Sequence, residues 1–598
     1  MKKHICTMTI GAAMLVHIPS VMSATALSTI EQNRFVVAGQ LNVNPDSLTV
    51  KQATKPYQSN PMKTSRSGRS TSGVSDMVGT LSVEKFPQYP SDPDPNLYYT
   101  HESADGFRGY LERWYRSNFV FRDSGVGVWQ YHDAPSGDNF DLWSANGTDY
   151  GIDAVRAAFH SGHGGMWSTN VFFAPMGSNW ADRGWNAFST QMFLGGNNYS
   201  YGDERLRYMF WDTCNSVMIS GGNNPYSTWG TRARGVRMVF GYETTSIDSP
   251  NYGKFFWEEW NKGKTLAQAF VDASWRINTR QSPAVVAFGS DANDAGYRLN
   301  NERYLYAGAV GNNWGQWRWY NARSVATSVR SAAADRLNSQ QGGTLYSVVP
   351  RSNMASEVTE IAHSFGINVY DASQIQKRPF GLQAVETKAG NLVVEKNGNF
   401  ELLLKTANTQ GGEGEVTDEE IIQKTYDLAT QLGFASNKDL QAGIVRTLNQ
   451  GGRGRGGVRS AAQVIEKTVV LDQLVQGVPF IDPQAGHLEV TFDSQTGQAK
   501  RVRSTLQEID TTSQKFATRA TRLTVKQARA AALKLFAKPG DRAAAVNQQT
   551  LSIAPGSEAV GYQVLDGKVV PVFRAEIRDS KEPFGRPKLA VVPLIQTD

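Results

Sequence analysis

Two short segments of this chain place reactive residue types in polar, glycine-rich turns. Residues 158–165 read Ala-Phe-His-Ser-Gly-His-Gly-Gly, and residues 208–216 read Tyr-Met-Phe-Trp-Asp-Thr-Cys-Asn-Ser. In each segment an apolar run ends in a turn, which carries His163 in one case and Cys214 in the other. A thiol beside an imidazole is a useful nucleophile, because the imidazole can also protonate a leaving amine. We therefore interpret Cys214 as a nucleophile for acyl transfer and His163 as its partner.

The elements that must position these residues are predicted to be strands of a parallel sheet. Short apolar runs bounded by glycine and polar residues are typical of strands covered on both faces. Four segments fit this pattern: Asp153–Phe159, Leu206–Trp211, Gly235–Phe240 and Ala284–Phe288. Between the last two, 252–277 is predicted to be helical, with a capping-box spacing that begins at Thr265. Strands alternating with helices predict an α/β layered fold, in which functional residues collect beyond the carboxyl ends of the strands.

The two segments resemble the signature blocks of clan CD cysteine peptidases, the caspase-like group that includes metacaspases, gingipains and legumain. Metacaspases are most similar, because they carry a Ser-Gly-His-Gly block and an Asp-Ser-Cys-His-Ser block. The corresponding blocks here are Ser-Gly-His-Gly at 161–164 and Asp-Thr-Cys-Asn-Ser at 212–216. The histidine and the cysteine are separated by about 50 residues, as in caspases. The segment 241–277 is also similar to the strand and helix that follow the nucleophile in bacterial caspase-like domains.

The resemblance covers about Tyr98 to Tyr320 and implies a fold, an activity and a set of roles. The implied fold is a caspase-like three-layer sandwich with a mostly parallel sheet, and the implied activity is that of a cysteine endopeptidase. Cys214 would attack the scissile carbonyl, and His163 would activate the thiol or protonate the leaving group. The backbone N–H groups of Gly164 and Cys214 would form the oxyanion hole, whose preorganised donors stabilise the developing charge.

Two acids are candidates for substrate binding. Asp212 matches the metacaspase aspartate that helps to bind a basic side chain before the scissile bond. A buried carboxylate facing Arg or Lys forms a charge-assisted pair, so we expect cleavage after Arg or Lys. Glu243 follows a predicted strand and is the second candidate to line the pocket. Asn215 and Val217 depart from the family pattern, which often has His and usually has Gly at these positions.

Each of these residues also has a structural interpretation. His160 fits a structural role better than a catalytic one, and Asp212 can instead cap a turn or pair with Arg207. Cys214 can be an inert core thiol in a binding module that kept the caspase-like fold without peptidase activity. A third alternative is a zinc hydrolase with His160, His163, Asp212 and Cys214 as ligands, because zinc accepts all three ligand types. The peptidase interpretation itself requires no cofactor and no metal.

The N-terminal residues predict export. Residues 1–26 begin with Lys2 and Lys3, continue as a short apolar run and end in small residues, which is the pattern of a secretory signal peptide. We therefore predict a secreted or periplasmic protein. Removal of this segment takes Cys6 away and leaves Cys214 as the single cysteine, so no internal disulfide is expected.

Composition narrows the classes of partner. The formal charge of +6 is small for 598 residues and is spread along the chain, which favours neither a nucleic acid nor a membrane as partner. The hydrophobic content of 40% suits folded cores. A protein or peptide substrate is the expected partner, and the sequence leaves the oligomeric state open.

Changes of composition and of local pattern divide the chain into six predicted parts. These are a signal peptide (1–26), an N-terminal segment and linker (27–97), a caspase-like catalytic domain (98–323), a connecting region (324–415), an α+β domain (416–510) and a second α+β domain (511–598). In the second half, capping-box spacings predict helices beginning at Thr417 and Thr524. Hairpins are predicted from Leu488–Phe492 with Ala499–Val502, and around Asp566-Gly567.

This helix-plus-hairpin pattern resembles the PepSY and thermolysin-propeptide-like domains that accompany secreted bacterial peptidases. The resemblance implies an inhibitory or chaperoning module, and a surface-binding or structural appendage is the alternative. Arg66, Arg69, Arg453 and Arg455 lie in stretches rich in Gly or Ser, which predict exposed and cleavable loops. We therefore predict Arg66 or Arg69, and Arg453 or Arg455, as processing sites of a zymogen whose pocket selects basic residues.

Overall fold

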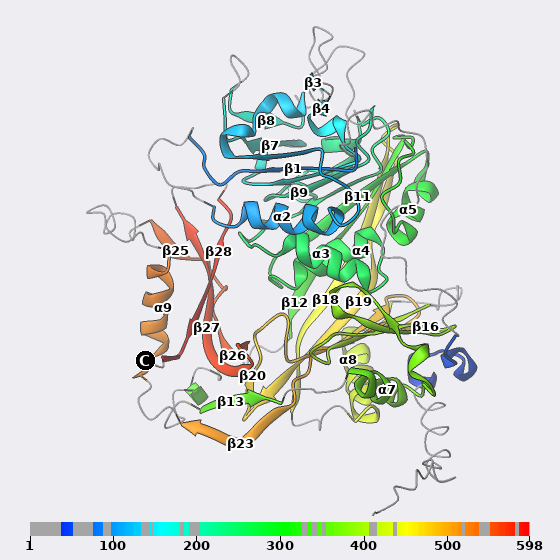
Figure 1. Ribbon diagram of the computed structural model, residues 1–598, viewed down its shortest axis with the longest axis vertical. Helices are drawn as coiled ribbons and strands as arrows, with labels where there is room; N and C mark the ends of the chain where they lie inside the picture. Colours follow the sequence, from blue (N-terminus) through cyan, green and yellow to red (C-terminus); the bar gives the residue numbers. More distant parts are fainter. Residues whose placement is uncertain are drawn as a thin grey trace, which may run out of the picture.

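The computed structural model is a mixed α/β protein built around one large mixed sheet (Figure 1). The structure describes residues 38–51, 76–87, 97–132, 143–145, 148–179, 184–190, 204–231, 233–325, 333, 335–337, 344–349, 354–405, 415–433, 439–516, 521–536, 550–580 and 585–596.

The N-terminal core of the large sheet is parallel. In spatial order its strands are β2 (Phe119–Arg122), β1 (Val78–Ser82), β5 (Ala157–Ser161), β9 (Tyr208–Asp212) and β10 (Met238–Tyr242). The sheet begins before the predicted boundary at residue 98, because β1 pairs with both β5 and β2. The carboxyl ends of these parallel strands share one edge of the sheet.

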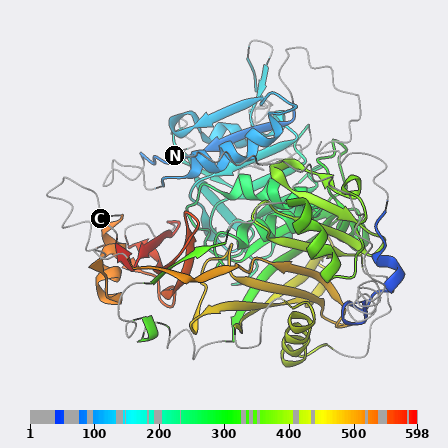
Figure 2. The same cartoon turned by 60° about the horizontal axis from the view of Figure 1, so that its bottom comes forward.

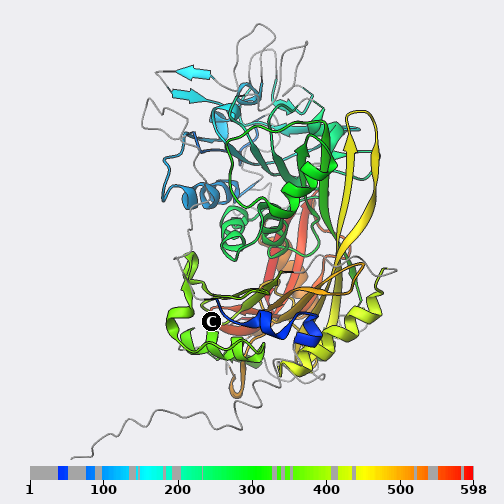
Figure 3. The same cartoon turned by 90° about the vertical axis from the view of Figure 1, so that its right-hand side faces the viewer.

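Antiparallel strands continue the same sheet into the second half of the chain. In spatial order they are β11 (Pro283–Gly289), β12 (Trp314–Ser324), β18 (Leu440–Gly454), β19 (Arg459–Val475), β21 (His487–Asp493), β22 (Ala499–Ser504), β17 (Phe400–Leu404), β16 (Gly390–Val394), β15 (Gln383–Glu386) and β14 (Gln376–Lys377), with β20 (Val478–Pro479) paired to β19. Figure 3 shows β18 and β19, in yellow, as a long ribbon that links the two halves.

A separate antiparallel sheet forms most of the C-terminal part, in orange and red at one side of Figure 2. It contains β23 (Ile509–Phe516), β13 (Thr344–Val348), β27 (Lys568–Asp579), β25 (Leu551–Ile553), β26 (Ala559–Leu565) and β28 (Lys588–Pro593). Smaller sheets are formed by β3 (Trp143–Ala145) with β4 (Thr148–Tyr150), by β6 (Gly165–Ser168), β7 (Val171–Pro175) and β8 (Asn186–Phe188), and by β24 (Thr521–Arg522) with β29 (Ile595–Gln596).

Helices pack mainly against one face of the parallel strands. They are α2 (Thr100–Leu111), α3 (Tyr252–Asn261), α4 (Leu266–Trp275) and α5 (Ala292–Asn301), with α7 (Met354–Ser364), α8 (Asp418–Gln431) and α9 (Val525–Lys534) in the second half. Phe159, Phe210 and Phe240 face α2–α4 in one buried cluster. Trp211 and Val239 belong to a second cluster on the opposite face, which includes residues of β7. Because successive side chains of a strand point to opposite faces of the sheet, each of these strands contributes to the hydrophobic cluster on either face.

Most of the predicted elements exist, but one expectation about the sheet was wrong. Ala284–Phe288 was expected to be parallel, and β11 instead runs antiparallel to β10. The predicted helical stretch 252–277 is two helices, and Thr265 caps the second by accepting a hydrogen bond from the backbone N–H of Gln268. In the second half, the helix starts at Thr417 and Thr524 and the hairpin at Asp566-Gly567 are confirmed.

The glycine-arginine run near residue 450 is only in part the exposed loop that we predicted, because Arg455 and the two glycines after it form an exposed turn while the residues before them lie in a strand. Its residues 450–454 end β18 and pair with β12, so Arg453 lies in a strand. A Cβ atom on Gly452 would lie 2.9 Å from the Trp314 side chain, and one on Gly454 would lie 2.8 Å from it. Gly452 and Gly454 are therefore required because an indole ring covers this end of the strand.

Some predictions fall on residues whose structure is not described. The signal peptide and the processing sites Arg66 and Arg69 lie outside the described residues. Among the helices that are described, none combines the length and the apolar composition needed to cross a bilayer.

Close packing between α2 and α3 gives a test of this architecture. A Cβ atom on Gly253 would lie 2.2 Å from the Phe107 backbone nitrogen and 2.3 Å from the Ser103 carbonyl oxygen. We expect Gly253→Ala to destabilise the protein by about 1–3 kcal/mol, because backbone atoms must move. The matched control is Gly109→Ala, since an added Cβ at that exposed site of α2 meets nothing within 4 Å. Equal thermal unfolding midpoints for the two variants would contradict the packing described here.

Candidate active site

The parallel pairing of β5 and β9 brings the two sequence motifs to the same edge of the sheet. Ser161 lies opposite Asp212 in the register of the two strands. His163 and Cys214 each follow two residues later, in adjacent turns. The turns also touch, because a Cβ atom on Gly164 would lie 2.9 Å from the Thr213 Cβ atom. The two segments predicted to supply the nucleophile, the base and the oxyanion donors are therefore neighbours.

The Cys214 thiol is buried, with 1% of the residue exposed. Its Sγ atom lies 3.8 Å from the Ser246 carbonyl oxygen and 3.9 Å from the Ser246 hydroxyl oxygen. Burial raises the pKa of the thiol above its ordinary value, while the positive charge of Arg586 and the Ser246 contacts oppose this rise. In this conformation the sulfur is a neutral thiol and has little contact with solvent.

The turn after Cys214 is held in an unusual backbone conformation. Asn215 has a φ of 54°, in the left-handed region that asparagine tolerates better than most residues. Its backbone N–H donates to the Thr244 carbonyl oxygen at 3.0 Å, and its side-chain amide donates to the Glu243 carbonyl oxygen at 3.0 Å. Asparagine therefore suits this position, at which metacaspases often have histidine.

His163 is also buried, and its ring centroid lies 4.7 Å from that of Phe86. Burial lowers the pKa of His163 to about 3, and the positive charges of Arg586 and Lys588 contribute to the decrease. His160 has the same pKa of about 3, caused by burial and then by Arg586. The His160 Nδ1 atom shares a hydrogen bond of 2.6 Å with the Tyr131 hydroxyl, as expected for a structural histidine.

Asp212 binds an arginine from the far end of the chain. Its Oδ1 atom accepts a hydrogen bond of 2.6 Å from the Arg586 Nη2 atom. Its Oδ2 atom accepts from the Ser103 hydroxyl at 2.8 Å and from the Ser161 hydroxyl at 2.7 Å. Burial raises the pKa of the Asp212 carboxyl, and Arg586 together with the two serines works against that rise. Asp212 therefore pairs with an arginine of its own chain, as in the structural interpretation, but the partner is Arg586 and not Arg207.

The Arg586 guanidinium has further partners around the same pocket. Its Nη1 atom donates to the Asp212 carbonyl oxygen at 3.0 Å and to the Ser161 hydroxyl at 3.3 Å. Its Nη2 atom also donates to the Ile247 carbonyl oxygen at 2.5 Å, and the group lies over the Tyr252 ring, 5.6 Å from its centroid. Burial acts to lower the pKa of Arg586, but Asp212 and the other nearby acidic groups hold it above its usual value.

Glu243 has a different position from the one expected. Its carboxylate accepts hydrogen bonds from the backbone N–H groups of Ile219 and Ser220, the latter at 3.1 Å. Burial raises the pKa of Glu243, and these hydrogen bonds oppose the increase. Glu243 therefore holds the turn at 219–220, while Asp212, Ser161 and the carbonyl group of Ile247 contact the guanidinium.

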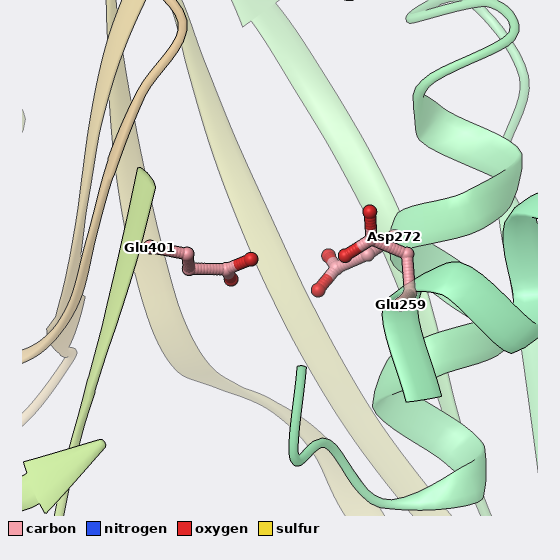
Figure 4. A group of neighbouring side chains, drawn as sticks. All are labelled: Glu259, Asp272 and Glu401. Carbon is pink, nitrogen blue, oxygen red and sulfur yellow. The ribbon is translucent and has the colours of Figure 1, made fainter. Parts of the chain in front are cut away.

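A separate group of acids lies between α3, α4 and the antiparallel strands (Figure 4). Glu259, Asp272 and Glu401 each place one carboxylate oxygen within 4.8 Å of the others. The Lys264 ammonium group occupies this position for a cation: its Nζ atom lies 2.8 Å from Asp272 and 2.7 Å from Glu401, and it also contacts Glu259. Arg501 contacts Asp272 as well. This cluster is a buried ion-pair network that joins the two halves of the protein.

The four residues considered as zinc ligands form no comparable group within the described part of the chain. The Nδ1 atom of His160 is bonded to Tyr131, and both carboxylate oxygens of Asp212 accept hydrogen bonds from serine or arginine donors. The His160 Nδ1 atom and the Asp212 carboxylate oxygens, which would bind a zinc ion, are thus hydrogen-bonded to other side chains of the protein. Sequence reasoning missed Ser103, Ser246 and Arg586, because each reaches the site from a distant segment with no motif around it.

Comparison with known proteins gives one partial match. Residues 83–322 match a family model described as "Domain of unknown function (DUF6345)". The match contains both strand ends with His163 and Cys214, and it ends well before the segment that supplies Arg586. No curated protein and no solved structure matches the chain.

The buried His160 gives a pH-dependent prediction. Its ordinary pKa is 6.5 and its pKa in the folded protein is about 3, so between these values the unfolded chain binds a proton that the folded chain excludes. The free energy of unfolding must then decrease as the pH falls through this window, by up to about 1.4 kcal/mol per pH unit for this residue. We expect His160→Gln to unfold with a shallower pH dependence than the unsubstituted chain. Parallel curves of melting temperature against pH would contradict this.

Proposed function

We propose that this protein is an exported cysteine endopeptidase with a caspase-like core, which cleaves peptide bonds after Arg or Lys. The observation that carries the proposal is the filled Asp212 pocket, in which a buried carboxylate, itself held by two serine hydroxyls, binds a guanidinium that also donates to Ser161. This pocket adjoins the turn that carries Cys214. The family-like motifs and their arrangement at one sheet edge support the same conclusion, as does the signal-like N-terminus.

In the proposed reaction His163 takes the proton of the Cys214 thiol, and the thiolate attacks the carbonyl carbon after a bound Arg or Lys. The backbone N–H groups of Gly164 and Cys214 stabilise the oxyanion. The carbon–nitrogen bond then breaks, and His163 returns its proton to the leaving amine. Water hydrolyses the resulting thioester, which releases the acid and restores the thiol. Asp212 binds the basic side chain and orients the scissile bond.

A second candidate is a binding module that retains the fold without peptidase activity. One observation favours it: burial raises the pKa of Cys214 and lowers the pKa of His163, so neither group is charged in this conformation. Both candidates bind a guanidinium at Asp212. They differ in whether Cys214 becomes a nucleophile once the pocket is available.

The two candidates are separated by labelling with an electrophilic arginyl probe. Because Arg586 fills the pocket, the experiment uses the full chain with Arg586→Ala, alone and combined with Cys214→Ala or His163→Ala. We expect covalent labelling at Cys214, competed by peptides that end in arginine amide. Labelling should fall on the order of 10²-fold or more in the His163→Ala protein, the usual contribution of a general base.

Two controls define the outcome. A metal chelator should leave the labelling rate unchanged, because the proposed dyad needs no metal, and inhibition by the chelator would favour the zinc alternative. A thiol that reacts only after denaturation would contradict the peptidase proposal and leave the binding module as the function.

A further inference from the structure

The residues that fill the candidate pocket belong to a segment outside the family match. Arg586 and Pro587 directly precede β28 of the C-terminal sheet. The side chain of Arg586 is fully buried, with 0% exposed, at the carboxyl ends of β5 and β9. The partner of Asp212 is therefore a residue of this chain, 374 positions away in the sequence.

The guanidinium is bound in the way that a substrate arginine must be bound. The planar group donates from two nitrogens to the Asp212 carboxylate, to two backbone carbonyl oxygens and to the Ser161 hydroxyl. Such forked donation selects arginine over other residues. The backbone acceptors compensate the burial of this guanidinium, and they place it beside a candidate nucleophile, so the same set of acceptors can hold the arginine of a substrate.

The backbone of the same segment also lies along the catalytic core. The Asp248 backbone N–H donates to the Pro587 carbonyl oxygen at 3.0 Å, and Asp248 forms a parallel β-bridge with Lys588. The Lys588 ammonium lies over the Tyr98 ring, 4.6 Å from its centroid. An extended peptide held by main-chain hydrogen bonds and side-chain pockets is a recurring mode of peptide recognition.

The C-terminal sheet keeps this segment in position through contacts away from the pocket. Glu576 of β27 accepts hydrogen bonds from Asn278 at 2.8 Å and from the Arg280 Nε atom at 2.9 Å. Arg574, also on β27, donates to the Ile277 carbonyl oxygen at 2.8 Å. A tethered ligand has a high effective concentration, so a separate peptide competes poorly with it.

We propose that residues 585–588 are an internal blocking segment, in which Arg586 occupies the substrate-arginine pocket and excludes peptide substrates until the segment is displaced. The inference rests on the proposed function, because it takes the Asp212 pocket to be the substrate pocket. The residue that follows Arg586 is a proline, whose ring nitrogen carries no hydrogen and whose φ is fixed. The bond that would be cleaved joins Arg586 to this ring, and Pro587 keeps the blocking segment from being consumed.

The positive charges of the segment also oppose catalysis, in addition to its position in the pocket. Arg586 and Lys588 both contribute to the low pKa of His163, so their departure makes the imidazole a stronger base. Displacement of the segment thus opens the pocket and prepares the base in one step.

The test compares full-length proteins with and without the blocking side chain. Arg586→Ala should hydrolyse a peptide amide with arginine before the scissile bond on the order of 10²-fold faster than the unsubstituted chain, since the tethered competitor is gone. The matched control is Arg280→Ala, which weakens the docking of the same sheet but leaves the Arg586 side chain in place, and it should activate the protein much less than Arg586→Ala does. Equal rates for all three proteins, or equal activation by Arg280→Ala, would overturn the proposal.

A second readout does not depend on catalysis. Benzamidine carries a planar cation and no peptide bond, and it should raise the melting temperature of Arg586→Ala and of Arg586→Ala combined with Cys214→Ala. It should leave the unsubstituted chain unchanged. If benzamidine raises the melting temperature of these variants but they hydrolyse no peptide, the proposal that residues 585–588 block the pocket is supported and the peptidase proposal is contradicted. If the unsubstituted chain hydrolyses peptides as fast as Arg586→Ala does, the peptidase proposal is supported and the blocking proposal is contradicted.

Arg586→Ala removes a buried ion pair and can fail to fold, so a further variant that retains Arg586 is needed. Pro587→Ala keeps the guanidinium in the Asp212 pocket and makes the following bond an ordinary secondary amide. We expect slow cleavage after Arg586, detected by mass spectrometry as release of residues 587–598, and its loss when Cys214→Ala is added. A Pro587→Ala chain that stays intact under conditions in which Arg586→Ala cleaves a free Arg-Ala peptide would contradict the role assigned to this segment.

Discussion

The buried ion pair between Asp212 and Arg586 connects the carboxyl edge of the parallel sheet with the last strands of the chain. Removing two charges from water is costly, and it is compensated here because both carboxylate oxygens and both terminal guanidinium nitrogens have several partners. The pair is one of the contacts that hold the C-terminal sheet on the core, together with those of Arg574 and Glu576. Burial is the main cause of the low pKa of His163 and of the raised pKa of Cys214, and the positive charge of Arg586 acts on both groups by lowering their pKa values.

The rest of the architecture holds this contact in place. The ribbon of β18 and β19 continues the sheet of the N-terminal core into the second half, and the Lys264 network joins α3 and α4 to that half. The C-terminal sheet docks through Arg574 and Glu576. The second half therefore places an arginine beside Asp212 of the first half.

Local signals made the core and the motif residues predictable. Apolar runs that end in polar turns marked β5 and β9, and the Asp566-Gly567 turn marked a hairpin. The direction of β11 was not predictable, because an apolar run reads the same in a parallel and an antiparallel strand. The tryptophan that covers the glycine-rich end of β18 lies more than one hundred residues earlier, so composition alone indicated a loop. Arg586 was missed for the same reason: the sequence around it has no feature that identifies its partner.

The central claim is that Asp212 selects a positively charged substrate side chain beside an active Cys214. Arginine and citrulline side chains have nearly the same shape and differ in charge, so a pair of peptides containing one or the other tests this claim directly. With Arg586→Ala in both proteins, the account predicts that kcat/KM favours the arginine peptide on the order of 10²-fold, and that Asp212→Asn removes most of this preference. Equal kcat/KM for the two peptides, or a preference that Asp212→Asn leaves unchanged, would contradict it.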